Sequence, residues 1–324
     1  METPAIRAEK LWVIYRPGIF QRKRIGLEDL DLEVRRNEVF GYLGANGAGK
    51  TTTIKTLVGL INADGGRAEI LGCPSGDARS RQKLGYAPEN PYFYEYLTPL
   101  EALDFYARLF AVPRPERRRR SAELLDRVGL GFAAKRRIRQ FSKGMLGRLG
   151  LAQSLINDPE VLILDEPMTG LDPVGRYDIR RLILDLKDAG KTIFFSSHIL
   201  ADVEAICDRA AVLHQARLVA CGTLSELLSS RTLGVEMTFE GLGPDLAGKL
   251  SRSARSFRSE GRLLHLVAAE EEDGNRMLAE AVSSGARLVR YAPVRESLED
   301  YFIRVRREAD SEPSTAGSGR EDSR

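Results

Sequence analysis

Short apolar runs and helical patterns alternate along the first part of the chain. The segments LWVIY and LEDLDLEV have the apolar, β-branched character of strands, and the basic stretch at residues 16–24 between them is typical of a surface loop. A third run, VFGYLG at Val39–Gly44, leads through a glycine-rich turn into the helical pattern TTIKTLVGL. These patterns predict a strand, a glycine loop and a helix in direct succession.

A block of helices covers about residues 90–157. Thr98 and Glu101 form a capping-box pattern with Pro99 at the first helical position, which predicts the start of an amphipathic helix. Helical spacing continues in AELLDRVGL and at residues 142–156, until an Asn-Asp-Pro sequence breaks it. We therefore expect a mostly helical segment here.

Two further apolar runs follow this block. VLIL covers residues 161–164 and TIFFSS covers residues 192–197, with a helical pattern between them. Because alternating strands and helices are typical of parallel sheets, we expect an α/β core with a mostly parallel sheet and an inserted helical subdomain. This core should occupy residues 1–228.

The pattern changes beyond residue 228. Three strand-like segments, GVEMTFE, LLHLVAA and ARLVRYA, alternate with helical patterns near residues 245–253, 274–284 and 296–307. They predict a small α+β domain over residues 229–307. Residues 308–324 are rich in Ser, Gly, Glu and Asp and lack large apolar side chains, so we expect a disordered tail.

Composition limits the class of protein. The 324 residues are 43% hydrophobic, which is enough for one large and one small domain. No apolar run approaches the ~18 residues of a spanning helix, and no signal peptide is apparent, so we expect a cytoplasmic protein. Three widely spaced cysteines, Cys73, Cys207 and Cys221, argue against a disulfide framework or a Cys-based metal site.

The charge pattern gives little sign of a nucleic-acid partner. The formal net charge is only +3, with acidic and basic residues interspersed. Four consecutive arginines at residues 117–120 form the one dense basic run. We favour a solvated helix face for so short a run, and the alternative is a contact with anionic lipid headgroups or nucleic acid.

A phosphate-binding motif follows the strand at Val39–Gly44. GANGAGKT matches G-x-x-x-x-G-K-[ST] between a predicted strand and a predicted helix, the context that this motif requires. Its backbone N–H groups would surround phosphate oxygens, Lys50 would reach the β and γ phosphates, and Thr51 would ligate Mg²⁺. The candidate binding residues are Gly44, Asn46, Gly47, Ala48, Gly49, Lys50, Thr51 and Thr52.

Two acidic residues end the strand VLIL. Asp165 and Glu166 stand at its carboxyl end, where an open α/β sheet presents its ligand crevice. Asp165 suits the Mg²⁺ shell, and Glu166 can polarise a water for attack on the γ-phosphate. An acidic pair after a strand is often only a helix cap, but the phosphate loop strengthens the catalytic interpretation.

With these motifs in place, the chain resembles an ABC-family ATPase. FSKGM at residues 141–145 is similar to the signature segment L-S-G-G-Q at Ser142 and Gly144, and the resemblance implies that these residues bind ATP held by the opposite subunit. TGLD resembles the D-loop, with Asp172 as its acid. His198 in FFSSH resembles the switch histidine that contacts the γ-phosphate.

The resemblance implies two more contacts with the nucleotide. Tyr15 falls where the family has an aromatic residue that stacks on adenine, with Trp12 as a competing candidate. Glu89 occupies the place of the Q-loop glutamine and keeps an oxygen for Mg²⁺ or water. Glu89 and the S-K-G-M signature resemble ATPases of type-2 ABC exporters.

The family implies an ATPase subunit that uses ATP and Mg²⁺. It would work as a homodimer on a separately encoded membrane permease, peripheral on the inner face of the membrane, and no direct nucleic-acid binding is expected. One alternative is a cytosolic ABC ATPase that acts on ribosomes or DNA. Another is a regulatory nucleotide-binding module, which the set of Lys50, Asp165, Glu166 and His198 disfavours.

Overall fold

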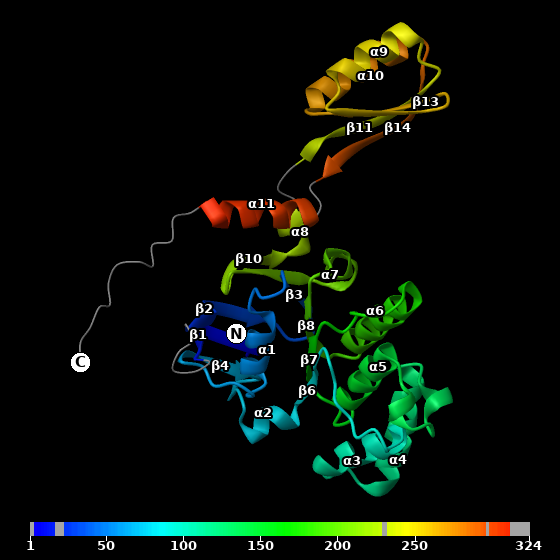
Figure 1. The fold of residues 1–324 in the computed structure, drawn as a ribbon. Coiled ribbons are helices and arrows are strands. Elements are labelled where there is room, and N and C mark those ends of the chain that lie inside the picture. Colours follow the sequence, from blue (N-terminus) through cyan, green and yellow to red (C-terminus); the bar gives the residue numbers. More distant parts are fainter. Residues whose placement is uncertain (1–2, 17–22, 229–231, 296–297, 312–324) are drawn as a thin grey trace, which may run out of the picture. The chain divides into compact units, whose positions relative to one another are not determined.

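The computed structural model describes residues 3–16, 23–228, 232–295 and 298–311. Two compact units make up the chain (Figure 1). The first unit contains the described residues up to Leu224 and those from Val305 onward, and the second unit is Ser225–Arg304. Within the described ranges, every helix is too short or too polar to span a bilayer.

A six-stranded sheet forms the centre of the first unit, with the strand order β10-β9-β3-β8-β7-β6. Its strands are β3 (Val39–Gly44), β6 (Leu84–Ala87), β7 (Val161–Asp165), β8 (Thr192–Ser197), β9 (Arg209–His214) and β10 (Arg217–Thr223). All neighbouring pairs are parallel except β10 with β9. The predicted α/β core with a mostly parallel sheet is therefore confirmed, and the carboxyl ends of β3, β7 and β8 meet at one edge.

The first unit also contains an antiparallel sheet, with the order β2-β1-β4-β5. Its strands are β1 (Ile6–Tyr15), β2 (Arg24–Val34), β4 (Gly65–Ile70) and β5 (Cys73–Pro74). The apolar runs of β1 and β2 predict these two strands. In β4 only Ile70 is buried, and no apolar alternation in the sequence marks this strand. Its pairing with β1 and β5 identifies β4 as part of the sheet.

Helices connect the strands of the first unit. They are α1 (Lys50–Leu57), α2 (Ala78–Gln82), α6 (Pro173–Asp188) and α7 (Leu200–Ile206), while α8 (Leu224–Leu228) begins at the boundary of the unit. The helix α6 joins β7 to β8 and buries an apolar stripe that includes Ile179, Leu182 and Leu186. Two parallel strands are thereby linked by a crossover helix, as the sequence pattern predicts.

The helical insertion contains α3 (Pro99–Leu109), α4 (Arg114–Arg127) and α5 (Lys143–Ser154), with 3₁₀ turns at Gly131–Ala133 and Ile138–Gln140. The predicted capping box is present at the start of α3. Thr98 Oγ1 accepts the Glu101 backbone N–H at 3.3 Å, and the Glu101 carboxylate accepts the Thr98 N–H at 2.8 Å. The helix α4 begins at Arg114, before the pattern AELLDRVGL. The first half of this helix is polar, so apolar spacing in the sequence does not mark its start.

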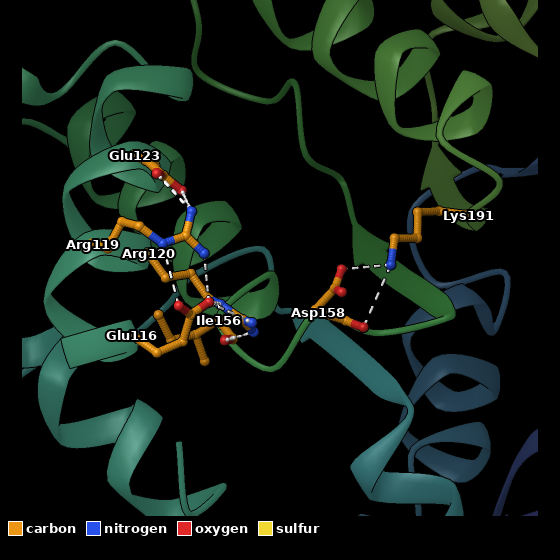
Figure 2. A network of polar contacts seen from close by, with 7 residues as sticks. All are labelled: Glu116, Arg119, Arg120, Glu123, Ile156, Asp158 and Lys191. Atoms are coloured by element: carbon orange, nitrogen blue, oxygen red, sulfur yellow. Dashed lines mark hydrogen bonds and ion pairs between the residues drawn. The ribbon is translucent and has the colours of Figure 1, made fainter. Parts of the chain in front are cut away.

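The basic run lies on α4, and three of its four arginines have partners within the insertion. Figure 2 shows those of Arg119 and Arg120. Arg119 pairs with two glutamates of the same helix. Arg120 donates to the carbonyl oxygen of Ile156 at 3.0 Å, and Arg117 pairs with Asp104 at 2.7 Å. Because the Arg117 and Arg120 side chains are only 15% and 25% exposed, they hold the insertion together and are not a freely solvated face.

The loop between α5 and β7 is fixed as well. Asp158 has a φ of 53°, and its carboxylate lies 2.6 Å from Lys191 Nζ (Figure 2). The hydrogen bond from Lys191 lowers the pKa of the Asp158 carboxyl. Lys191 immediately precedes β8, so the exit of the helical insertion is tied to the central sheet.

The second unit has a sheet with the order β12-β13-β11-β14, in which every pair is antiparallel. Its elements are β11 (Thr232–Glu240), α9 (Pro244–Ser253), β12 (Ser256–Glu260), β13 (Leu263–Ala268), α10 (Glu271–Ser283) and β14 (Arg287–Arg295). This βαββαβ order is that of a ferredoxin-like fold. A separate core that includes Met237, Phe239 and Leu266 holds it together.

The last helix, α11 (Leu298–Ser311), enters the segment where the sequence predicts a tail. Residues 308–311 are helical, so that prediction is wrong for these four positions. The sequence RREAD continues the helix with good helix formers. The rest of the predicted tail, residues 312–324, lies outside the described residues.

Candidate nucleotide-binding site

The glycine loop curls between β3 and α1. Gly49 immediately precedes α1 with a φ of 110°, and an added Cβ there would lie 2.6 Å from the carbonyl oxygen of Gly26. Gly47 has a φ of 83°, and an added Cβ would meet nothing within 4 Å. Glycine adopts these backbone angles without strain. The loop can therefore direct the N-terminal N–H groups of α1 at an anion.

A cavity of about 510 Å³ lies beside this loop. Its lining comes from the antiparallel sheet, the glycine loop and the loops that follow β6, β7 and β8: Tyr15, Arg24, Ile25, Gly26, Ala45, Asn46, Gly47, Gly49, Lys50, Thr51, Thr52, Glu89, Glu166, Thr169 and His198. Gly44 ends β3, and buried Ala48 lies within the loop. The fold thus brings most of the predicted site residues into one cavity.

Lys50 is the buried cation of the cavity. Its Nζ donates to the carbonyl oxygen of Gly44 at 2.7 Å and lies 3.2 Å from Glu166 Oε1. The side chains of Lys50 and Glu166 are only 6% and 8% exposed. Charges so well shielded from water interact more strongly than they would on the surface. The ammonium group is therefore held at the start of the loop.

Asp165 and Glu166 are positioned by the register of the central sheet, in which Asp165 lies opposite Ser196. Ser196 Oγ donates to Asp165 Oδ1 at 2.6 Å and accepts the backbone N–H of Glu166 at 3.0 Å. Burial raises the pKa of the Asp165 carboxyl, although hydrogen bonds from Ser196 and Thr51 act in the opposite direction. The Glu166 backbone turns sharply here, with a φ of 52°.

The carboxylate of Glu166 is oriented by side chains from three loops. Its Oε2 lies 2.8 Å from His198 Nδ1 and accepts the Thr169 hydroxyl at 3.1 Å. Its Oε1 is buried and has an ion-pair distance to Lys50, but the geometry is not that of a hydrogen bond. Oε1 therefore lies buried against the Lys50 ammonium group.

Tyr15 and Glu89 lie at the same cavity. The Tyr15 hydroxyl is 3.1 Å from Thr52 Oγ1, and the residue is 39% exposed. An added Cβ on Gly26 would lie 2.7 Å from the Tyr15 ring, so the absence of a side chain at Gly26 gives the ring its space. Trp12, the competing aromatic, is not part of the lining, and Glu89 is exposed.

Ser142, Gly144 and Asp172 are not among the residues that line the cavity. Ser142 caps α5 and accepts the Met145 N–H at 3.3 Å. Asp172 caps α6, where its carboxylate accepts a backbone N–H at 2.9 Å. An added Cβ on Gly144 would lie 3.2 Å from Leu171 Cδ2, so the start of α5 packs beside the loop that precedes α6.

The sequence indicates no role in this site for Ser196 or Gly26, and it marks Thr169 only as part of the D-loop segment TGLD. The partners of Ser196 and Gly26 are distant in sequence, whereas Thr169 donates to Glu166 only three residues before it. Among the described residues, no group of three or more His, Cys, Asp or Glu side chains could hold a metal.

Comparisons with known proteins identify the family of the chain. A profile of the ABC transporter family matches residues 27–169. The chain is 46% identical to an uncharacterized ABC transporter ATP-binding protein of Synechocystis, over 95% of this chain and 87% of the relative. It is 34% identical to the Nod factor export ATP-binding protein I of Ralstonia nicotianae, over 88% and 91% of the two chains.

Among solved structures, the ATP-binding subunit of an ABC transporter is 33% identical and has a TM-score of 0.61, with 69% of this chain and 91% of that chain covered. In this chain the glycine loop follows β3, Asp165 and Glu166 stand at the end of β7, and His198 follows β8. The chain belongs to the family of ABC transporter ATP-binding proteins and carries its ATPase domain.

Proposed function

We propose that this protein is the ATP-hydrolysing subunit of an ABC exporter and that it drives a separately encoded permease through dimer closure. The environment of Glu166 carries the proposal. Its carboxylate lies 3.2 Å from Lys50 and 2.8 Å from His198, at a cavity beside a phosphate-binding loop. A fixed carboxylate can position water against a terminal phosphate that a cation holds.

The cavity has suitable groups for each part of ATP. The glycine-loop N–H groups and Lys50 would bind the phosphates. The partly exposed ring of Tyr15 would stack on the adenine. The Glu166 carboxylate would accept the proton of the attacking water, and Thr169 and His198 orient it through Oε2. His198 also lines the cavity, beside the position proposed for the γ-phosphate.

Thr51, which lines the cavity, and Asp165, which is buried beside Thr51, would hold Mg²⁺. Glu89 lines the cavity and offers a further oxygen. Hydroxyl and carboxylate oxygens are the ligands that Mg²⁺ prefers, and the ion usually takes only one or two protein groups beside phosphate oxygens. A cation near Asp165 would favour the charged carboxylate, which burial otherwise disfavours. When bound, Mg²⁺ supplies charge neutralisation between the phosphates.

The second copy of the chain would complete the site. Ser142 is exposed at the N-terminus of α5, outside the cavity of its own subunit, where it is available to a nucleotide in the partner. Helix N-termini favour anions, which suits Ser142 and Gly144 for a contact with the γ-phosphate. Asp172 caps α6. It would lie at the interface between the two copies.

Export and the permease partner are inferred from the relatives, among which is a Nod factor export ATP-binding protein. The protein would then be peripheral on the inner face of the membrane. A role on ribosomes or DNA is the competing proposal. The net charge of +3 and the internal ion pairs of Arg117, Arg119 and Arg120 do not favour a nucleic-acid surface.

Three variants of the full chain test the proposal, with the permease added if the isolated subunit dimerises poorly. Glu166→Gln keeps the nucleotide contacts but removes the proton acceptor, so hydrolysis should fall by ~10²-fold or more while ATP binding persists. Lys50→Ala should weaken ATP binding even in a monomer. Gly144→Asp should spare monomer binding and block ATP-dependent dimerisation, because its carboxylate would face the partner's γ-phosphate.

Gly144→Ala is the matched control for the charge. It introduces the same Cβ 3.2 Å from Leu171 Cδ2 but adds no negative group. Nucleotide affinity, oligomeric state and ATPase rate should be measured for each variant. Normal hydrolysis by Glu166→Gln would refute the catalytic assignment. Equal losses of dimerisation in the two Gly144 variants would refute the contact with the partner's nucleotide.

A further inference from the structure

One buried hydroxyl joins the two acidic residues of the site. Ser196 is fully buried in β8, directly opposite Asp165 of the neighbouring strand. Its Oγ is 2.6 Å from Asp165 Oδ1 and 3.0 Å from the backbone nitrogen of Glu166. The serine touches no residue of the glycine loop in these contacts and does not line the cavity. It therefore acts on the site only through its neighbours.

The direction of both hydrogen bonds is fixed by the chemistry of the groups. A backbone N–H can only donate, so the serine oxygen accepts from Glu166. The single hydroxyl proton of Ser196 is then directed at the Asp165 carboxylate. Hydrogen bonds to a charged acceptor are the stronger kind, which holds this carboxylate oxygen in one orientation.

The second bond acts where the backbone leaves the strand. Glu166 has a φ of 52°, a conformation that non-glycine residues seldom adopt and that the surroundings must maintain. Ser196 binds the N–H of this same residue. The turn directs the Glu166 side chain to Lys50 and His198, so a change at Ser196 would reach the carboxylate through the backbone.

We infer that Ser196 is a positioning residue that sets the metal-facing carboxylate of Asp165 and the water-facing carboxylate of Glu166 together. This inference rests on the proposed function, because it assigns those two tasks to the acidic pair. Loss of the hydroxyl should weaken Mg²⁺-dependent nucleotide binding and slow hydrolysis. Loss of a group that supports a metal ligand typically costs about 10- to 100-fold in metal affinity or activity.

Ser196→Ala is the principal variant, and Ser196→Cys nearly keeps the volume with a much weaker donor and acceptor. Thr192→Val is the matched control. Thr192 lies in the same strand, is also buried, and accepts the Asn37 N–H at 3.0 Å, away from the acidic pair. Valine removes this hydroxyl at nearly constant shape. Ser196→Thr restores a hydroxyl and serves as the rescue variant.

The first measurement is the gain in ATP affinity when Mg²⁺ replaces EDTA, read with a fluorescent ATP analogue on the full chain. Ser196→Ala and Ser196→Cys should lose about 10-fold of this gain, and Ser196→Thr should recover most of it. The second measurement is the Mg²⁺ concentration for half-maximal hydrolysis, which should rise in the same order. Thr192→Val should leave both quantities unchanged, even where its melting temperature falls.

Two outcomes would overturn the inference. Either the wild type gains no affinity from Mg²⁺, or the Ser196 variants keep the same gain and Mg²⁺ requirement as Thr192→Val. A failure of the proposed function has a different result, since Glu166→Gln would then hydrolyse ATP like the wild type. If Glu166→Gln is inactive while Ser196→Ala keeps normal Mg²⁺ dependence, only the positioning role is refuted.

Discussion

Two positions of the glycine loop, Gly47 and Gly49, differ in the space that is available for a side chain. Gly47 and Gly49 both have positive φ, at 83° and 110°. An alanine Cβ would meet no atom within 4 Å at Gly47, but it would lie 2.6 Å from the Gly26 carbonyl oxygen at Gly49. Gly47→Ala therefore tests backbone strain alone, whereas Gly49→Ala adds a clash with backbone.

The magnitudes follow from these two contributions. A left-handed conformation costs about 1–2 kcal/mol for a residue with a Cβ, and this is the expected loss of stability for Gly47→Ala. Overpacking adds about 1–3 kcal/mol, so Gly49→Ala should lose about 2–5 kcal/mol. The carbonyl oxygen of Gly26 belongs to β2 and cannot turn away like the end of a flexible side chain.

Urea unfolding of both variants, without nucleotide, measures the difference. Because the chain has two units, the relevant transition is first identified in the wild type as the one that ATP shifts to higher urea. The midpoint should fall further for Gly49→Ala than for Gly47→Ala at an unchanged slope. Equal losses, or a larger loss for Gly47→Ala, would refute the assignment of the close contact.

Three other changes have defined outcomes. Tyr15→Ala should weaken ATP binding by about 3- to 10-fold, whereas Tyr15→Phe should keep most of the affinity because the ring remains; fluorescence titration compares them. Glu89→Gln should retain substantial ATPase activity, since the amide keeps an oxygen; a loss as large as that of Glu166→Gln would contradict this. The Arg117 hydrogen bond lowers the pKa of Asp104, so this carboxylate stabilises the fold above about pH 4 and the contribution is lost as pH falls through the folded pKa. Asp104→Asn should cost about 1 kcal/mol or less at pH 7 and reduce the acid sensitivity in urea titrations.

Local patterns predict those parts of the fold whose cause is local. The runs VFGYLG and TIFFSS coincide with β3 and β8 because both strands are buried over their whole length. The start of α3 follows from its capping box. In contrast, all five residues of β12 are exposed, so no hydrophobic pattern marks this strand, and its pairing with β13 defines it.

Residues of the site are likewise predictable only where their cause is local in sequence. The glycine loop and the acidic pair are identifiable because their residue types stand next to one another in sequence. Ser196 could not be identified, because its partners Asp165 and Glu166 are about 30 positions away and meet it only through the register of β7 with β8. The room for the Tyr15 ring depends similarly on Gly26, a residue of the adjacent strand.

The division of the chain into units has a consequence for protein engineering. The chain leaves the first unit after Leu224 and rejoins it at Val305, so the ferredoxin-like unit is an internal insertion and not a terminal appendage. A stop codon after α8 would also delete the part of α11 that belongs to the first unit. To remove or exchange the second unit, Ser225–Arg304 should therefore be excised and Leu224 joined to Val305 through a linker. This design keeps the last turns of α11 in the first unit.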